Sequence, residues 1–474
     1  MLISGCKVEV IHYLQLVVIM KLLPQQYRSV AYYPVLMAIL LALTGCQSPK
    51  AIGINEGGKV ADGNIALPCK FGKDTTATSQ SANKSKIVLM LDGSGSMVGY
   101  AKDSNSRFVQ TLKLLDRVSL AAPGGVEYAR IDTGRKSIDR AEFQKSFGTS
   151  FYTGQTSMIA DAFPNRKTAK GEQLIAVVTD LQPDDGDVNL VSKRILEDYL
   201  KRDGYAVAVW GIRSEFDGKV YPPNNAPAYA YVGKSTSNGR PFYILLLGKY
   251  EAIAEFAKTI RSADESGLLK DRSHLTIFTA DRTISLPSYL TASQDNLPKG
   301  VNAPDSLSQD RFLMENGEQP IQFLEVDENS NPDKKSLKYL LKYQANPDTA
   351  IPSQLEPKYQ VHKYNEEKDK PAFTDSNKLL LDISSSLVDD KLGIEMKFDP
   401  AKIERGLYYI TADLTARSIQ APAVWKEWDD GGKKDGSKTQ GLNDFFNSLS
   451  INTTSVMKEK SPVVARLCYG IQRN

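Results

Sequence analysis

Hydrophobic residues in the first half of the chain form short continuous runs that alternate with segments of helical periodicity. The continuous runs predict strands at 87–91, 174–179, 205–212 and 243–247, and a further strand is predicted at 126–131. Apolar residues three or four apart predict helices between them, with Phe108, Leu112 and Leu115 on one face, Val188, Val191, Ile195 and Tyr199 on another, and Ile253, Phe256, Ala257 and Ile260 on a third. Such alternation favours a mainly parallel sheet with helices on both faces. Residues 85–265 are therefore predicted to form a doubly wound α/β domain.

The pattern changes beyond residue 265. Turn-rich spacers separate strands predicted at 275–278, 321–326, 337–343, 379–384, 392–398 and 408–412. Residues 270–416 are interpreted as a β-rich, sandwich-like domain, for which an immunoglobulin-like topology is one option. In 417–474, a loop rich in glycine and aspartate precedes a short amphipathic helix and a C-terminal strand. The helix carries Leu442, Phe445, Phe446 and Leu449 on one face and is predicted to pack on a core.

Length and charge narrow the class of protein. A chain of 474 residues suggests two or three domains. With 41% hydrophobic residues, 24% charged residues and a formal net charge of +3, it is neither a disordered chain nor a broadly basic nucleic-acid binder. No nucleic-acid partner is expected.

The N-terminal segment has the features of a targeting signal. Ala31–Leu43 is an apolar stretch preceded by Lys21 and Arg28, and it is too short to span a bilayer comfortably. It leads into Leu-Thr-Gly-Cys at 43–46, which resembles the lipobox of bacterial lipoprotein signal peptides. The resemblance implies cleavage before Cys46, which would carry the lipid. An ordinary signal of this kind would start at Met20.

The lipobox makes 1–45 the signal peptide and ties the mature chain to the bacterial cell envelope. In a Gram-negative envelope, Gln47 rather than aspartate after the cysteine favours the outer membrane. Residues 46–84 are rich in Gly, Ser, Thr, Asn and Lys, which predicts a flexible tether. An oxidising compartment permits a disulfide between Cys69 and Cys468, with two unrelated thiols as the alternative.

Polar residues follow the first predicted strand directly. Asp92, Ser94 and Ser96 have the spacing D-x-S-x-S, which in an extended loop places alternate side chains on one side. One carboxylate and two hydroxyls are hard oxygen ligands, suited to Mg²⁺ or Mn²⁺. In doubly wound folds ligands bind beyond the carboxyl ends of strands, where Asp92 is expected to lie. The glycine spacing here fits neither a dinucleotide fingerprint nor a Walker loop.

Together these residues resemble the von Willebrand factor A (VWA) family, whose metal-ion-dependent adhesion site combines D-x-S-x-S with a threonine and an aspartate on two further loops. Thr156 in TGQTSM matches the threonine, and Asp180, at the end of VVTD, matches the aspartate. The resemblance covers 85–265 and implies a Rossmann-like VWA fold. One departure is Leu181, where many family members have glycine.

The resemblance also implies a function. The family binds Mg²⁺ (or Mn²⁺) through residues matching Asp92, Ser94, Ser96, Thr156 and Asp180, and a protein ligand donates an acidic residue to the ion. The chain is therefore expected to be a membrane-anchored binding protein and not an enzyme. Two alternatives stay open: a scaffold or chaperone-like factor for envelope complex assembly, and a metal-dependent hydrolase built on Asp92. The sequence has no H-E-x-x-H or G-x-S-x-G motif that would favour catalysis.

Overall fold

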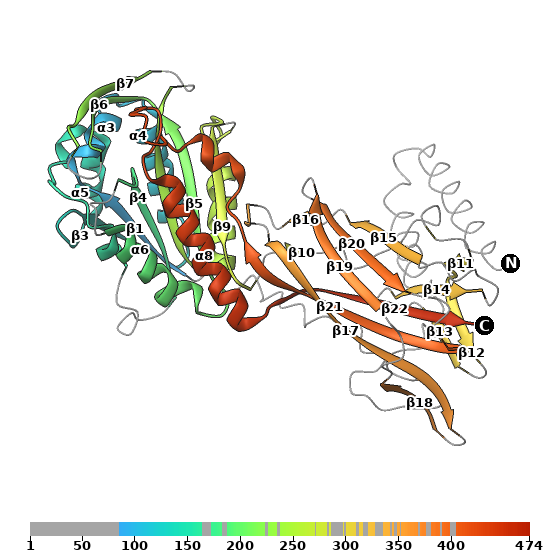
Figure 1. Ribbon diagram of the computed structural model, residues 1–474. Helices are drawn as coiled ribbons and strands as arrows, with labels where there is room; N and C mark the ends of the chain where they lie inside the picture. The colour runs from blue at the N-terminus through green and yellow to red at the C-terminus, as the bar shows by residue number, and fades with distance from the viewer. Residues whose placement is uncertain are drawn as a thin grey trace, which may run out of the picture.

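The computed structural model describes residues 85–474 apart from short gaps. The gaps are 164–171, 183–186, 223–225, 235–237, 271, 282–283, 286–296, 298–299, 310–311, 316–320, 328–334, 342–343, 346–347, 351, 368–369, 376–380, 389–390 and 399–403. The predicted signal peptide, Cys46, the tether and Cys69 lie outside the described residues. The described chain forms an α/β part and a sheet-rich C-terminal part (Figure 1).

The α/β part is built on a seven-stranded sheet with the order β3-β2-β1-β4-β8-β5-β9. Its strands are β1 (Lys86–Asp92), β2 (Val126–Ile131), β3 (Arg135–Ile138), β4 (Gln173–Thr179), β5 (Tyr205–Ser214), β8 (Arg240–Lys249) and β9 (Ser273–Phe278). All five strands predicted in this part are present. Strands β1, β4, β5 and β8 contain continuous apolar runs that are buried on both faces of the sheet, whereas β2 (VEYARI) is only partly buried.

The expectation of a mainly parallel sheet is only partly correct. Strand β1 pairs in parallel with β2 and β4, but β8 lies between β4 and β5 and is antiparallel to both. Strands β3 and β9 are antiparallel to their neighbours as well. The connection between β5 and β8 explains why β8 is antiparallel. Strand β5 is followed by a β ribbon, β6 (Phe216–Val220) and β7 (Tyr229–Gly233), instead of a crossover helix, so the chain re-enters the sheet in the opposite direction.

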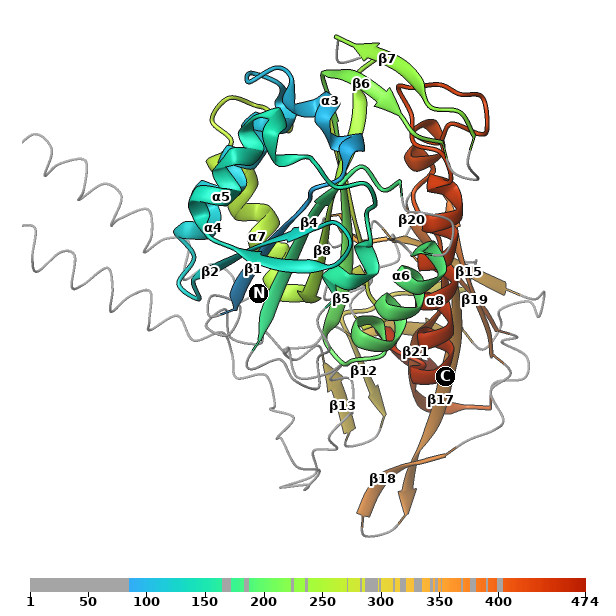
Figure 2. The same ribbon diagram turned by 90° about the vertical axis from the view of Figure 1, so that its left-hand side faces the viewer.

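Helices cover both faces of this sheet, as predicted (Figure 2). They are α3 (Val98–Ala101), α4 (Arg107–Leu120), α5 (Arg140–Gln144), α6 (Asp187–Ile195), which continues into a π turn at Leu196–Leu200, and α7 (Tyr250–Ala263). Alternate residues of β1 enter two different cores. Ile87, Leu89 and Leu91 pack with α4 and α7, whereas Val88 and Met90 belong to the core that includes α6. The N-cap of α4 is Ser106, whose hydroxyl accepts a hydrogen bond from the Val109 N–H.

The C-terminal part consists of sheets, as predicted. A six-stranded sheet has the order β11 (Val301–Asn302), β14 (Gln322–Val326), β22 (Val463–Arg473), β21 (Gly406–Ile419), β17 (Pro352–Glu367) and β18 (Lys370–Asp375). A three-stranded sheet contains β15 (Lys335–Leu341), β20 (Lys391–Phe398) and β19 (Leu381–Val388). Two small pairs are β12 (Ser306–Gln309) with β13 (Phe312–Glu315), and β10 (Ile284–Ser285) with β16 (Gln344–Ala345).

Two predictions about this part need correction. Strand β9, expected to open the β-rich domain, instead pairs with β5 as an edge strand of the α/β sheet. Strands β14 and β22 pair in parallel, unlike the antiparallel sheets of an immunoglobulin-like sandwich. In both cases the apolar run identified a strand correctly, but a run alone does not specify which strand it pairs with.

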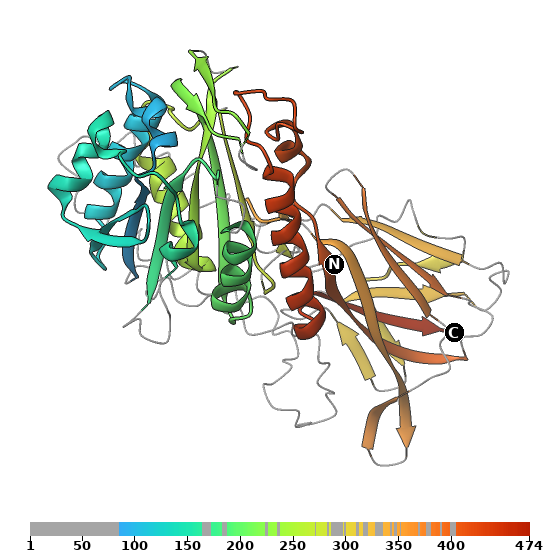
Figure 3. The same ribbon diagram turned by 60° about the vertical axis from the view of Figure 1, so that its left-hand side comes forward.

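The C-terminal segment connects the two parts (Figure 3). It leaves β21, forms the 3₁₀ turn η10 (Ala423–Glu427), continues as α8 (Leu442–Lys460) and ends in β22. The four apolar residues predicted for this helix are buried, but the helix has 19 residues and is not short. Its second half, INTTSVMKEK, contains weak helix formers, and burial of Thr453, Val456 and Met457 overrides that propensity. No helix in the described part of the chain is long and apolar enough to span a membrane.

Candidate metal site at the carboxyl edge of the sheet

The site lies where β1 and β4 end side by side. Both strands are parallel and adjacent, and the chain leaves β1 to form β2 on one side and returns to form β4 on the other. This is the topological switch point of the sheet, where doubly wound folds bind ligands. Asp92 is the last residue of β1, and Asp180 directly follows β4. Both side chains are about 1% exposed.

Backbone hydrogen bonds join the loop after β1 to the loop that contains Thr156. The Gly154 N–H donates to the Gly93 carbonyl (2.9 Å), and the Gly95 N–H donates to the Gly154 carbonyl (2.8 Å). A side chain at Gly154 would force a neighbour to shift, since its Cβ would lie 2.9 Å from Asp132 Cβ and 3.1 Å from the Gly93 carbonyl oxygen. The D-x-S-x-S loop is thus fixed against the second loop by main-chain contacts.

Asp92 is held by three donors. Its Oδ1 accepts the Ser94 N–H (2.9 Å), and its Oδ2 accepts the hydroxyls of Ser157 (2.7 Å) and Thr179 (2.9 Å). Burial raises the pKa of the Asp92 carboxyl, while the hydrogen bonds from Ser157, Ser94 and Thr179 act in the opposite direction. These contacts fix the carboxylate in one orientation.

Asp180 is less completely satisfied. Its Oδ1 accepts the Gln182 N–H (3.3 Å), but its buried Oδ2 has no hydrogen-bond partner among the described residues. Burial, followed by the negative charge of Asp92, raises the pKa of Asp180 to about 6, whereas the positive charge of Arg240 lowers it. The second carboxylate therefore lies buried beside the first with one oxygen unpaired.

Leu181 shows how tightly the chain turns after Asp180. Its φ is +51°, in the left-handed region that glycine adopts more easily, and its side chain is buried. The Leu181 N–H donates to the Thr179 hydroxyl (3.2 Å).

Arg240, at the start of β8, places a positive charge beside the carboxylates. Its side chain is 1% exposed, and its Nη1 donates to the carbonyls of Gly436 (2.9 Å) and Lys438 (3.0 Å) in the C-terminal segment. The charge of Asp180 and the charge of Arg240 both act on Tyr100, whose pKa burial raises. Arg240 therefore partly compensates the negative charge of Asp180.

The five predicted ligands differ in how closely the structure connects them to the two aspartates. The hydroxyls of Ser94 and Ser96 lie 3.0 Å apart, and Ser96 also interacts with Asp180. Thr156 is half-buried on the second loop, but the hydroxyl that bonds Asp92 belongs to the next residue, Ser157. The sequence interpretation missed Ser157, Thr179 and Arg240. Only Thr179 had a signal, as the polar residue just before Asp180 in an otherwise apolar strand.

The donor set fits a hard divalent cation. Asp92, Asp180 and the serines offer only oxygen atoms, and the unpaired Oδ2 of Asp180 is a buried acceptor that a cation would satisfy. Within the described ranges, no group of three or more His, Cys, Asp and Glu side chains is placed to hold a metal ion. A site here therefore depends on hydroxyls in addition to the two carboxylates.

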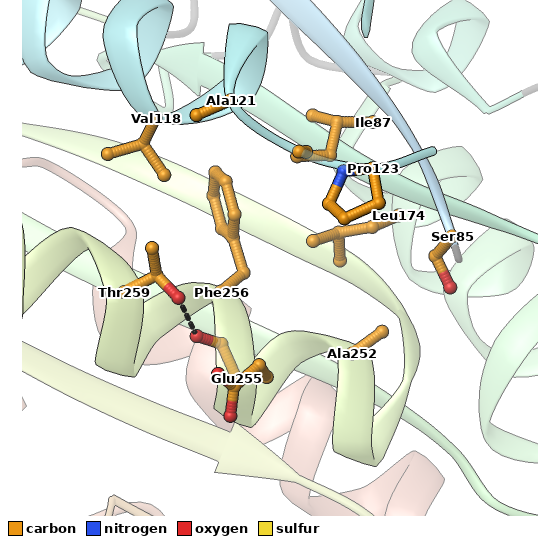
Figure 4. A pocket seen from close by; sticks show the side chains of 11 residues that line it. Ser85, Ile87, Val118, Ala121, Pro123, Leu174, Ala252, Glu255, Phe256 and Thr259 are labelled. Atoms are coloured by element: carbon orange, nitrogen blue, oxygen red, sulfur yellow. Dashed lines mark hydrogen bonds between the residues drawn. The ribbon is translucent and has the colours of Figure 1, made fainter. Parts of the chain in front are cut away.

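An apolar pocket lies at the opposite end of the sheet (Figure 4). It opens between α4 and α7, and its lining includes Ile87, Pro123, Leu174 and Phe256. The nearby Thr259 hydroxyl donates to the Glu255 carbonyl within α7. Glu255 is the one carboxylate in the described lining of this pocket, whereas two buried carboxylates lie at the carboxyl edge.

Cys468 lies in β22, is 5% exposed and is disulfide-bonded. The other three cysteines of the chain all precede residue 85 and lie outside the described residues. Pairing with Cys69 therefore stays a prediction, although the bonded state of Cys468 is in accord with it.

Comparisons of the chain with protein-family models, with curated proteins and with solved structures found no match.

Proposed function

We propose that this chain is a lipid-anchored protein of the bacterial cell envelope that binds a protein partner through a Mg²⁺-dependent adhesion site of the VWA kind. The observation that carries the proposal is the pair of buried carboxylates, Asp92 and Asp180, at the switch point of the sheet, with Asp180 Oδ2 unpaired in the described structure. Burying two like charges is costly unless a counter-charge is present.

In this proposal Asp92, Ser94, Ser96, Thr156 and Asp180 hold the ion, directly or through water. The ion supplies a hard Lewis acid that accepts a carboxylate oxygen of the partner. Ser157 and Thr179 keep the Asp92 carboxylate oriented through their hydrogen bonds. Two aspartates, Arg240 and one divalent ion together carry a single net positive charge, which favours an acidic side chain as the ligand.

The test is a pull-down from envelope and secreted fractions with the full chain purified in mild detergent. Mg²⁺ is compared with EDTA, and wild type with Asp92→Ala. Asp217→Ala, which removes an exposed carboxylate from the β6–β7 ribbon, is the matched control. A partner retained only in Mg²⁺, by wild type and the control, supports the proposal. The same proteins retained under all conditions would contradict it.

The captured partner also separates two roles. A subunit of an envelope complex would favour a part in assembly, whereas a surface protein from outside the cell would favour adhesion. Both use the same site.

A further inference from the structure

Arg130, on β2, contacts both loops of the candidate metal site. Its Nη2 donates to the Thr153 hydroxyl (2.8 Å) and lies 3.4 Å from the Gly93 carbonyl. Gly93 stands between Asp92 and Ser94, and Thr153 stands three residues before Thr156. One guanidinium therefore bridges the D-x-S-x-S loop and the loop that carries the predicted threonine ligand.

Two further contacts fix this guanidinium. Its Nε lies 3.2 Å from the Asp132 carboxylate, and its Cζ lies 5.0 Å from the centre of the Phe151 ring. The side chain is only 15% exposed. The carbonyl of Asp132 accepts the N–H of Met158, which follows Ser157. Arg130 thus contacts the second loop directly at the Thr153 hydroxyl, and it pairs with Asp132, whose main chain holds the same loop at Met158.

Gly93 leaves the space that the arginine occupies. A Cβ built at Gly93 would lie 2.3 Å from Arg130 Nε and 3.0 Å from its Cζ, so any side chain there would displace the guanidinium. At Gly95, two residues further along the same loop, the nearest atom to such a Cβ is the Gly154 carbonyl oxygen at 3.6 Å, an ordinary contact. The two glycines therefore differ in what an alanine would disturb.

We propose that Arg130 is a positioning residue for the metal site, and that its guanidinium, with Nη2 at both ligand-bearing loops and Nε beside Asp132, sets the distance between these loops. The inference rests on the proposed function, because it assigns a role at the same site. The charge of Arg130 and its positioning of the loops should have opposite effects on Mg²⁺ affinity. A nearby positive charge alone would oppose cation binding, whereas correct placement of the loops favours it.

The experiment measures Mg²⁺ affinity by calorimetry on the full chain in detergent. Arg130→Met and Arg130→Lys are both expected to lose about tenfold or more in affinity, because lysine cannot reproduce the bridging geometry. Arg135→Met, which removes an exposed arginine from the neighbouring β3, is the matched control and is expected to bind as wild type does. A cooperative urea-unfolding transition in EDTA shows that each variant is folded without the ion.

Glycine variants give an independent reading if Arg130→Met does not fold. Gly93→Ala is expected to weaken Mg²⁺ binding about as much as Arg130→Met, and Gly95→Ala to have little effect. The double variant Gly93→Ala with Arg130→Met should lose no more than either single variant, because both act through the same guanidinium.

The outcomes separate this inference from the proposed function. If Asp92→Ala abolishes Mg²⁺ binding but Arg130→Met binds as tightly as wild type or more tightly, the positioning role is wrong and the metal site stands. Wild-type Mg²⁺ affinity in Arg130→Lys would also overturn the positioning role, because a positive charge without the shape of the guanidinium would then be enough for binding. If the wild-type chain binds no Mg²⁺, both the proposed metal site and the positioning role of Arg130 are wrong.

Discussion

Two buried aspartates of the α/β part differ in how their charge is compensated. Asp116, on α4, accepts the Tyr128 hydroxyl (2.6 Å) and pairs with the Arg140 guanidinium, whose Nη2 lies 2.9 Å from Asp116 Oδ2. Asp180, at the carboxyl edge, has Arg240 nearby but keeps one buried oxygen without a partner among the described residues. The first carboxylate is completed by neighbouring side chains, and the second is not.

The difference indicates what each region contributes. A carboxylate that its own neighbours satisfy contributes to folding, as expected for a helix packed on a sheet. Two neighbouring carboxylates, one of them with an unpaired oxygen, are costly to bury, and natural proteins usually keep such an arrangement where a ligand completes it. Substitutions in the two regions should therefore have different effects on Mg²⁺ binding and on stability.

The largest expected effect comes from exchanging each carboxylate for an amide. Asp92→Asn should lower Mg²⁺ affinity by about a hundredfold or more, because it removes a charged ligand around which the loops are arranged. Asp116→Asn should leave Mg²⁺ affinity unchanged but lower the free energy of unfolding in EDTA. Calorimetry with Mg²⁺ and urea unfolding measure the two quantities. Equal loss of Mg²⁺ affinity in both variants would show that the regions do not differ.

A somewhat smaller effect is expected on stability when Mg²⁺ is added to the wild-type chain. A ligand that binds only the folded state, at a free concentration one hundred times its Kd, raises the free energy of unfolding by about 2.7 kcal/mol. Asp180→Asn should lose most of this increase, whereas Asp116→Asn should keep it. Urea unfolding in Mg²⁺ and in EDTA gives the comparison. An equal increase in all three proteins would place the Mg²⁺ elsewhere.

The sequence was a better guide to strands and helices than to their partners. Apolar runs located β1, β4, β5 and β8, because strands buried on both faces need continuous hydrophobic residues. They did not reveal that β8 inserts as an antiparallel strand. Strand β17, with 16 residues, was missed because its prolines and charges break the apolar pattern, and among its described side chains only a few are buried.

In the candidate site, too, some residues could be predicted from the sequence and others could not. Residues that end strands could be identified from the sequence, so Asp92 and Asp180 were predicted and lie together at one edge. Residues that support them come from elsewhere in the chain. Arg130 and Arg240 belong to no recognisable sequence motif. They reach the site only because β2 and β8 pair with their neighbours in the sheet. Such contacts depend on tertiary structure and leave no local signal.

A more modest effect is expected from pH in the absence of metal. The pKa of Asp180 is about 6 in the folded chain, against an ordinary value of 3.8, so the folded state binds this proton more tightly than the unfolded state does. Lowering the pH from 7 to 5 in EDTA should therefore stabilise wild type by about 1 kcal/mol relative to Asp180→Asn. Urea unfolding at the two pH values measures it. The same pH dependence in both proteins would mean that Asp180 is ionised throughout this range.

The smallest expected effect distinguishes two neighbouring hydroxyls. Ser157→Ala removes one of three hydrogen bonds to Asp92, so it should weaken Mg²⁺ binding by about five- to tenfold, in line with about 1 kcal/mol for such a bond. Thr156→Val should cost more if Thr156 is the ligand that the VWA resemblance implies, because a ligand is lost and not only its support. Ser119→Ala, which removes a buried hydroxyl from α4, is the control. A larger loss in Ser157→Ala than in Thr156→Val would assign the hydroxyl ligand to Ser157. The second loop would then be offset by one residue from the family pattern, although the buried carboxylates would still define the site.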